Sequence, residues 1–134
     1  GAIYVSNISD NRNVTITDTE FGGTEETDGN TATYGGAIYA SETDVTITNT
    51  EFSKNEAVYG GAIYIAESSD LTSIELNDVT FEGNSAQNDP VNGNSSAIAK
   101  LAGSTLLINK DGVNVSANAL LEFLSDDEYA AKLP

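Results

Sequence analysis

Carboxylates dominate the chemistry that this chain can carry out. Its 134 residues include 21 Asp and Glu against 5 Lys and Arg, and they contain no Cys, His, Met or Trp. The formal charge of −16 excludes a nucleic-acid-binding function, because phosphate neutralisation needs Lys and Arg. Zinc sites built on Cys or His, thiol nucleophiles and imidazole acid–base catalysis are excluded by the same composition.

One acidic cluster offers carboxylates for a cation. Glu25, Glu26 and Asp28 are close together in a polar stretch, and calcium takes about six to eight oxygen ligands from loops of this kind. The stretch matches neither the EF-hand loop nor the Gly-Gly-x-Gly-x-Asp nonapeptide. We therefore expect no obligatory cofactor. Calcium at these three residues is an option, and solvated loop charge is the alternative.

Internal repeats define the elements that must position these groups. Gly-Ala-Ile-Tyr begins at residues 1, 36 and 61, and the weaker Ser-Ala-Ile-Ala begins at residue 96. A second block at residues 14–21 recurs at 45–52 and 74–81. In a fourth unit Leu106, Ile108 and Val113 fall at the offsets of Val45, Ile47 and Phe52.

Apolar residues alternate with polar or aromatic ones in both blocks, as in Ile38 and Ala40 or Val45 and Ile47. This period of two predicts strands with one buried face. A short strand cannot bury that face alone, but stacked units can share an apolar interior. We therefore expect an all-β parallel β-helix of about four coils over residues 1–116. A three-sided coil is expected, with loop insertions at 25–34 and 87–95.

The last residues, 117–134, form a separate helical cap or tail in this interpretation. Leu120, Leu121 and Leu124 precede Ser125-Asp126-Asp127-Glu128, which matches a helix-initiating capping box. The pattern predicts a short helix that reaches Leu133 and covers the C-terminal end of the β-helix.

Phe, Asn and Gly recur at fixed places in the repeats. Phe21, Phe52 and Phe81 are expected to stack inside as an aromatic ladder. Asn55 and Asn84 can bond their side-chain amides to the backbone at the corners of adjacent coils. A glycine that opens each Gly-Ala-Ile-Tyr block suits a corner with close backbone approach.

Tyrosines supply the candidate binding surface. If the isoleucines of the first block point inward, then Tyr4, Tyr39 and Tyr64 point outward and stack on successive coils. Tyr34 and Tyr59 precede the glycine pairs and can widen this patch or cover it. Such rings suit contact with a sugar or a protein, and a stack covered by a loop is the structural alternative.

Gly-Gly-Ala-Ile at residues 35–38 and 60–63, paired with Phe-x-x-Asn at 52–55 and 81–84, resembles the repeats of the chlamydial polymorphic outer-membrane protein family and of related bacterial and archaeal adhesin-like proteins. The resemblance covers about residues 1–113. It implies a right-handed, single-stranded parallel β-helix from a surface adhesin. The first unit departs from this pattern, with Phe-Gly-Gly-Thr at residues 21–24.

The leading functional hypothesis is a non-catalytic, adhesin-like module, secreted or at the cell surface, that binds a protein or glycan of a host or another cell. One alternative is a fibre subunit that stacks head to tail through an open N-terminal coil. Another is a fragment of a carbohydrate-active β-helix enzyme, although the single Arg12 and four lysines are not brought together by the repeat. The short apolar runs predict no membrane insertion.

Overall fold

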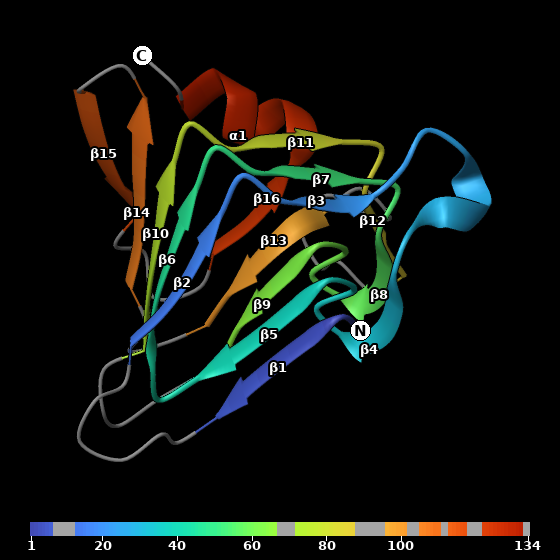
Figure 1. The fold of residues 1–134 in the computed structure, drawn as a ribbon, viewed down its shortest axis with the longest axis horizontal. Coiled ribbons are helices and arrows are strands. Elements are labelled where there is room, and N and C mark those ends of the chain that lie inside the picture. The colour runs from blue at the N-terminus through green and yellow to red at the C-terminus, as the bar shows by residue number, and fades with distance from the viewer. Residues whose placement is uncertain are drawn as a thin grey trace.

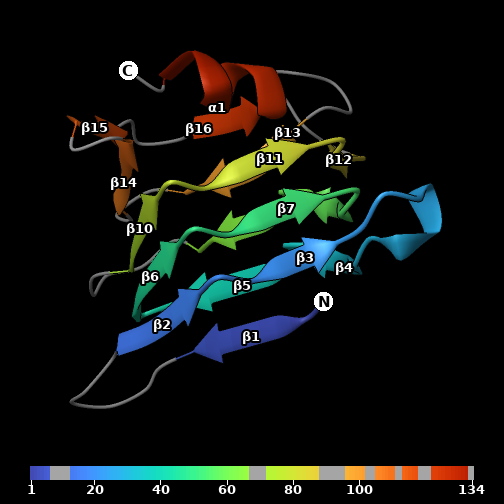
Figure 2. The same cartoon turned by 45° about the horizontal axis from the view of Figure 1, so that its top comes forward.

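The chain folds as a parallel β-helix (Figure 1). A computed structural model describes residues 1–6, 13–66, 72–87, 96–101, 105–110, 113–117 and 122–132. The strands form two five-stranded and two three-stranded sheets, and neighbours within each sheet come mostly from successive repeats. Figure 2 shows these coils as steps that rise from β1 to the C-terminal helix.

Each of the first three coils contributes one strand to each sheet. The first coil has β1 (Ile3–Ser6), β2 (Asn13–Thr17), β3 (Glu20–Gly22), a 3-10 turn η1 (Glu26–Asp28) and β4 (Thr31–Tyr34). The second has β5 (Ile38–Ser41), β6 (Asp44–Thr48), β7 (Glu51–Ser53) and β8 (Glu56–Tyr59). The third has β9 (Ile63–Ile65), β10 (Ser73–Asn77), β11 (Thr80–Glu82) and β12 (Ser85–Ala86). The C-terminal part has β13 (Ser96–Lys100), β14 (Thr105–Lys110), β15 (Val113–Ala117), β16 (Glu122–Ser125) and α1 (Asp126–Lys132).

The strand register confirms the predicted alignment of the repeats. In one sheet Ile3 pairs with Ile38, Ile38 with Ile63, and Ile63 with Ile98, all in parallel. In the next sheet the same order runs through Val14, Val45, Ile74 and Leu106. Equivalent residues therefore lie directly above one another along the β-helix.

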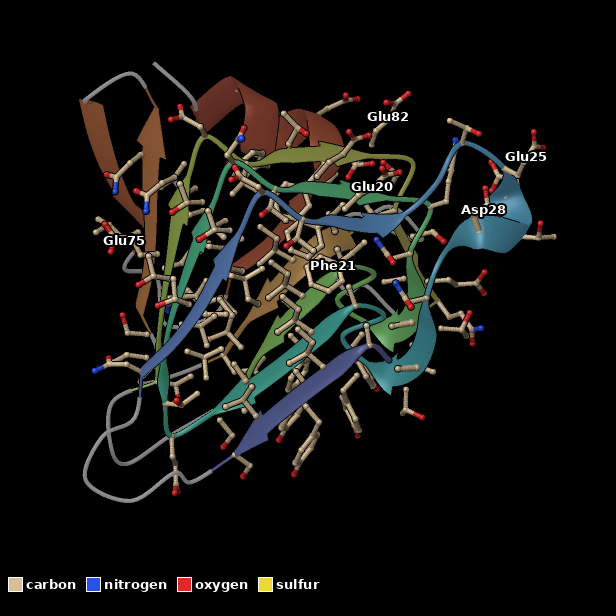
Figure 3. All side chains as sticks on the ribbon, in the orientation of Figure 1. Glu20, Phe21, Glu25, Asp28, Glu75 and Glu82 are labelled. Atoms are coloured by element: carbon tan, nitrogen blue, oxygen red, sulfur yellow. The ribbon has the colours of Figure 1, made fainter. Side chains whose placement is uncertain are left out.

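Stacked inward side chains form the core. Ile38, Ile63 and Ile98 are fully buried, as the period of two predicts. The Phe21, Phe52 and Phe81 rings stack with centroids 5.0 Å apart in both steps, which confirms the aromatic ladder. Figure 3 shows Phe21 directed into the space between the sheets. Lys100 is the charged side chain that is fully buried among the residues whose burial is described.

Each of the first three coils has a fourth short strand that the repeat analysis did not predict. Residues 31–34, expected within a loop insertion, form β4, which pairs in parallel with β8. The insertion in the first coil is therefore confined to the turn around η1. The expectation of a three-sided coil is wrong, because four sheets line the β-helix. The second expected insertion, 87–95, lies outside the described residues apart from Gln87.

The fourth unit departs from the predicted repeat after β14. Val113 does not take the place of Phe52, because β15 turns back and pairs antiparallel with β14. The next strand, β16, pairs antiparallel with β13. Helix α1 then lies close to the position that the capping-box pattern predicts, and its Tyr129 ring meets Phe81 edge to face at 4.6 Å. An aromatic ring from the helix thus covers the open face of the phenylalanine ladder.

A second internal ladder is built from asparagines. The Asn55 side-chain amide donates to the Phe21 carbonyl at 2.9 Å and to Asn84 Oδ1 at 3.0 Å. Asn84 likewise donates to the Phe52 carbonyl at 2.9 Å, which confirms the predicted corner bonds. Asn30, which the Phe-x-x-Asn pattern missed, forms a further rung by donating to Asn55 Oδ1 at 3.1 Å.

Asp126, the first residue of α1, ends this ladder. Its two carboxylate oxygens accept the side-chain amide of Asn84 at 2.9 Å and the Asn84 backbone N–H at 3.1 Å. A carboxylate accepts hydrogen bonds and donates none, so the chain of donors stops there. Burial raises the pKa of Asp126 above its usual 3.8, although the hydrogen bonds from Asn84 oppose that shift.

Glycine is required at the corners before the inward Ile38 and Ile63. Gly35 and Gly60 both have φ of +63°, where a side chain is strained. At Gly61 an added Cβ would lie 2.4 Å from the Ser85 carbonyl oxygen of the next coil. Close stacking of the coils therefore depends on the glycine pairs.

Removing one asparagine rung tests the ladder. We expect Asn84→Ala to lower the free energy of unfolding by about 1–3 kcal/mol, because buried donors on Asn55 and an acceptor on Phe52 lose their partner. Urea denaturation followed by circular dichroism measures the change. The exposed Gln87→Ala is the control, expected within about 0.5 kcal/mol of the parent. Equal stability of the two variants would contradict the role of the ladder.

The pH dependence of stability tests Asp126. Because its folded-state pKa is raised, the folded chain binds the proton more tightly than the unfolded chain does. The stability that this tighter proton binding contributes is complete at pH values below the pKa of Asp126 in the unfolded chain. It is lost as the pH rises through the pKa of Asp126 in the folded chain. We expect the parent to lose stability relative to Asp126→Asn as the pH rises above 3.8. Denaturant titrations at several pH values measure this, with the exposed Glu20→Gln as control; a difference that grows in the other direction would refute the assignment.

Candidate functional site: a tyrosine surface

Three tyrosines stack on the outside of the β1, β5 and β9 sheet. They occupy paired positions in the parallel register. The Tyr4 and Tyr39 rings are 4.8 Å apart with an interplanar angle of 3°, and Tyr39 and Tyr64 are 5.5 Å apart at 7°. The structure thus brings together the outward column that the alternation predicts.

A second column stands beside the first. Tyr34 on β4 and Tyr59 on β8 stack at 5.5 Å. The Tyr34 ring also meets Tyr64 edge to face at 4.9 Å and Tyr39 at 6.5 Å. All five predicted residues therefore form one connected cluster, here called the tyrosine surface, composed of Tyr4, Tyr34, Tyr39, Tyr59 and Tyr64.

Stacking decides which parts of these rings a partner can reach. Tyr4 is 73% exposed and Tyr34 is 44% exposed, whereas the other three tyrosines are partly buried. Inside a column each ring face is covered by the next ring. Among the tyrosines of this surface, Tyr4 and Tyr34 therefore have the largest exposed fractions.

The Tyr39 hydroxyl of this surface is neutral at physiological pH. Burial raises the pKa of Tyr39 above its usual 10.0, and the nearby phenols of Tyr4 and Tyr34 raise it further. A hydrogen bond with Ser41 acts in the opposite direction. A neutral phenol both donates and accepts hydrogen bonds, so the surface can satisfy either kind of polar group.

A pocket of about 280 Å³ opens between the two columns. The rings of Tyr4, Tyr34 and Tyr39 form its aromatic walls. The remaining lining residues are small or aliphatic: Gly1, Ala2, Ile3, Ala32 and Gly35. These residues include no Asp, Glu, Lys or Arg, although Gly1 carries the N-terminal ammonium, which donates to the Thr31 carbonyl at 2.7 Å.

Acidic groups gather along a different edge of the β-helix. A groove of about 330 Å³ is lined by four carboxylate residues together with Asn49 and three threonines; the acids are Asp18, Glu20, Glu51 and Asp78. Asn49 donates to Asp18 Oδ1 at 2.6 Å. Figure 3 shows Glu20 and Glu82 at this outer side, away from the core. The four acids of this groove and the five tyrosines thus lie on different strands and corners of the β-helix.

The predicted calcium ligands have other partners. Asp28 Oδ2 accepts the Glu25 backbone N–H at 3.0 Å, and Glu26 lies 3.3 Å from Lys54 Nζ. Glu25 and Asp28 sit on the protruding η1 turn (Figure 3). Within the described ranges, no group of three or more His, Cys, Asp or Glu residues converges as a metal site would. Calcium binding at this turn stays a prediction, and the described residues show no converging set of ligands for it.

Comparisons with known proteins place these repeats. Over the part of the chain that the structure covers, no helix is long and apolar enough to cross a membrane. No curated protein and no solved structure matches the chain. Residues 28–41 and 49–66 match the family model described as the Chlamydia polymorphic membrane protein repeat. Both segments include tyrosines of the tyrosine surface. The match confirms the resemblance that the Gly-Gly-Ala-Ile and Phe-x-x-Asn motifs indicate and supports a cell-surface location, and over these residues the chain is similar to that repeat.

Proposed function

We propose that this chain is a non-catalytic, extracellular adhesin-like module whose tyrosine surface binds a partner on a cell or substrate. The repeat match suggests a surface-exposed, adhesin-like module. The observation that carries the proposal is the connected set of five tyrosines on the outside of an otherwise acidic chain. Exposed aromatic residues that cluster in this way are typical of recognition surfaces.

Rigidity supports this assignment. The tyrosine rings are held by stacking within each column and by edge-to-face contacts between the columns. Beneath them the parallel strands bury Ile38 and Ile63 completely. Binding then requires little ordering of the site, and a smaller ordering cost leaves more of the contact energy as affinity.

The net charge of −16 supports a role in display. Core positions such as Ile63 and Ile74 are uncharged and buried, so most acidic side chains lie on outward faces and turns. Like charges on these faces discourage lateral association of sheet-rich molecules and keep them apart in solution. The tyrosine surface then stays accessible.

The two alternatives receive less support. At the C-terminal end, β14 and β13 pair with the antiparallel strands β15 and β16, and Tyr129 covers Phe81. This closure disfavours a fibre in which parallel coils continue from one copy to the next. For an enzyme, the acidic groove would need a carboxylate with a raised pKa. Asp126, whose pKa is raised by burial, is not among the residues that line this groove and is engaged by Asn84.

Cell binding tests the proposal. The chain, immobilised on fluorescent beads, is applied to a panel of cultured cells. We expect saturable binding that falls by about tenfold or more in the double variant Tyr39→Ala with Tyr64→Ala, because aromatic anchors dominate binding energy. Circular dichroism verifies folding of each variant. Thr46→Ala on β6, in another sheet, is the matched control and should bind like the parent. Binding that is absent across the panel, or unchanged in the double variant, would refute the proposal.

A further inference from the structure

We infer that α1 masks a latent strand-binding site at the C-terminal end of the β-helix, and that this site fits an extended strand carrying Phe-x-x-Asn. Such a strand would come from a second chain that contains the same repeat. Helix α1 lies beside β11, which is the last strand of its three-stranded sheet (Figure 2). The contacts between α1 and the third coil are separate from the tyrosine surface.

The backbone beside β11 shows which groups a next coil would bond. Between the second and third coils, the Thr50 carbonyl accepts the Thr80 N–H at 3.1 Å. Val79 holds the position of Thr50 in the third coil, and its carbonyl accepts the Tyr129 hydroxyl at 2.9 Å. A side chain of α1 thus replaces the backbone donor that a next coil would supply.

Asp126 makes the same replacement at the asparagine ladder. The Asn55 N–H donates to Asn84 Oδ1 of the next coil at 3.1 Å. At the last rung, the Asn84 N–H donates to Asp126 Oδ2 at the same distance of 3.1 Å. The Gly83 N–H also bonds the Asp126 carboxylate. Asp126 therefore accepts the bond that an asparagine of a next coil would accept.

Tyr129 takes the place of the next phenylalanine ring. Phe52 and Phe81 stack at 5.0 Å with an interplanar angle of 8°, whereas Tyr129 meets Phe81 at 4.6 Å and 66°. Asp126 and Tyr129 are three residues apart in a helix, so they lie on one face. Helix α1 consequently imitates a Phe-x-x-Asn strand, with the two groups in reverse order along the chain.

The imitation lacks two features of a strand. Asn84 donates its side-chain amide to the Phe52 carbonyl at 2.9 Å. Asp126 cannot do the same for the Phe81 carbonyl, because an ionised carboxylate has no donor. A helix also bonds its backbone groups internally, so it offers no row of them to the edge of β11. A Phe-x-x-Asn strand would supply both the amide donor and the backbone row, as in other cases of strand addition.

The length of α1 favours its displacement. The helix has seven residues, and a helix this short is marginally stable in water on its own. Its presence therefore depends on the contacts that Asp126 and Tyr129 make with the third coil. An unpaired strand edge invites pairing with another chain. Helix α1 thus acts as an autoinhibitory cover for the edge of β11.

A peptide of residues 49–58, which contains Phe52 and Asn55, is the probe for the latent site. We expect it to bind the double variant Asp126→Ala with Tyr129→Ala at least about tenfold more tightly than the parent, because the competing side chains are absent. Anisotropy of a fluorescent label on the peptide measures binding. Circular dichroism verifies that the variant is folded.

Matched peptides and a matched variant provide the controls. Peptides with Phe52→Ala or Asn55→Ala should each bind the double variant about tenfold more weakly than the unsubstituted peptide. Asp127→Ala removes the same charge as Asp126→Ala from an exposed position of α1, and it should bind the peptide like the parent. Equal binding of the three peptides, or no binding of the unsubstituted peptide to the folded double variant, would overturn the inference.

A milder variant keeps the test decisive if the double variant does not fold. Tyr129→Phe keeps the ring and removes the bond to the Val79 carbonyl. We expect the Asn84 N–H to exchange with deuterium about threefold faster in this variant than in the parent, relative to the Asn55 N–H inside the ladder. Added peptide should slow this exchange again. Exchange that neither the substitution nor the peptide changes would overturn the inference.

Discussion

Parallel stacking in exact register is the constraint on which the rest of this structure depends. Ile3, Ile38, Ile63 and Ile98 pair in one continuous series, so each side chain meets the equivalent side chain of the next coil. Phenylalanines consequently stack on phenylalanines inside, and tyrosines on tyrosines outside. At the C-terminal end of each series the last side chain has no equivalent residue to pair with, so it needs a partner from another element. The phenylalanine ladder ends against Tyr129 and the asparagine ladder against Asp126.

The parts of the fold that repeat were predictable, and the parts that break the repeat were not. Phe21, Phe52 and Phe81 align without gaps, so their register follows from spacing alone. The fourth strand of each coil was missed because Thr31–Tyr34 and Glu56–Tyr59 share little beyond an alanine and a tyrosine. The prediction for Val113 assumed that the fourth unit keeps the spacing of the repeat. The chain instead reverses after β14 and pairs with that strand as a hairpin, which the spacing does not reveal.

The candidate site shows the same division. Period two alone determines that Tyr4, Tyr39 and Tyr64 point outward together. The edge-to-face contacts of Tyr34 and the pocket depend on the angle at which two sheets meet, and no spacing rule encodes that angle. At the acidic turn, closeness in sequence did not predict how the carboxylates are arranged. Asp28 folds back onto the Glu25 backbone while Glu26 extends to Lys54, so neighbours in the chain direct their carboxylates to different partners.

Stacking also determines what kind of surface a partner meets. A ring in the middle of a column gives its faces to its neighbours and shows only its edge and hydroxyl. Each added coil therefore makes a column more rigid. It adds little exposed ring-face area, because the new ring stacks on its neighbour. Tyr34, which is 44% exposed, meets Tyr39 and Tyr64 edge to face and stacks on Tyr59. Tyr34 thus joins the two columns, and stacking within each column holds that junction in shape.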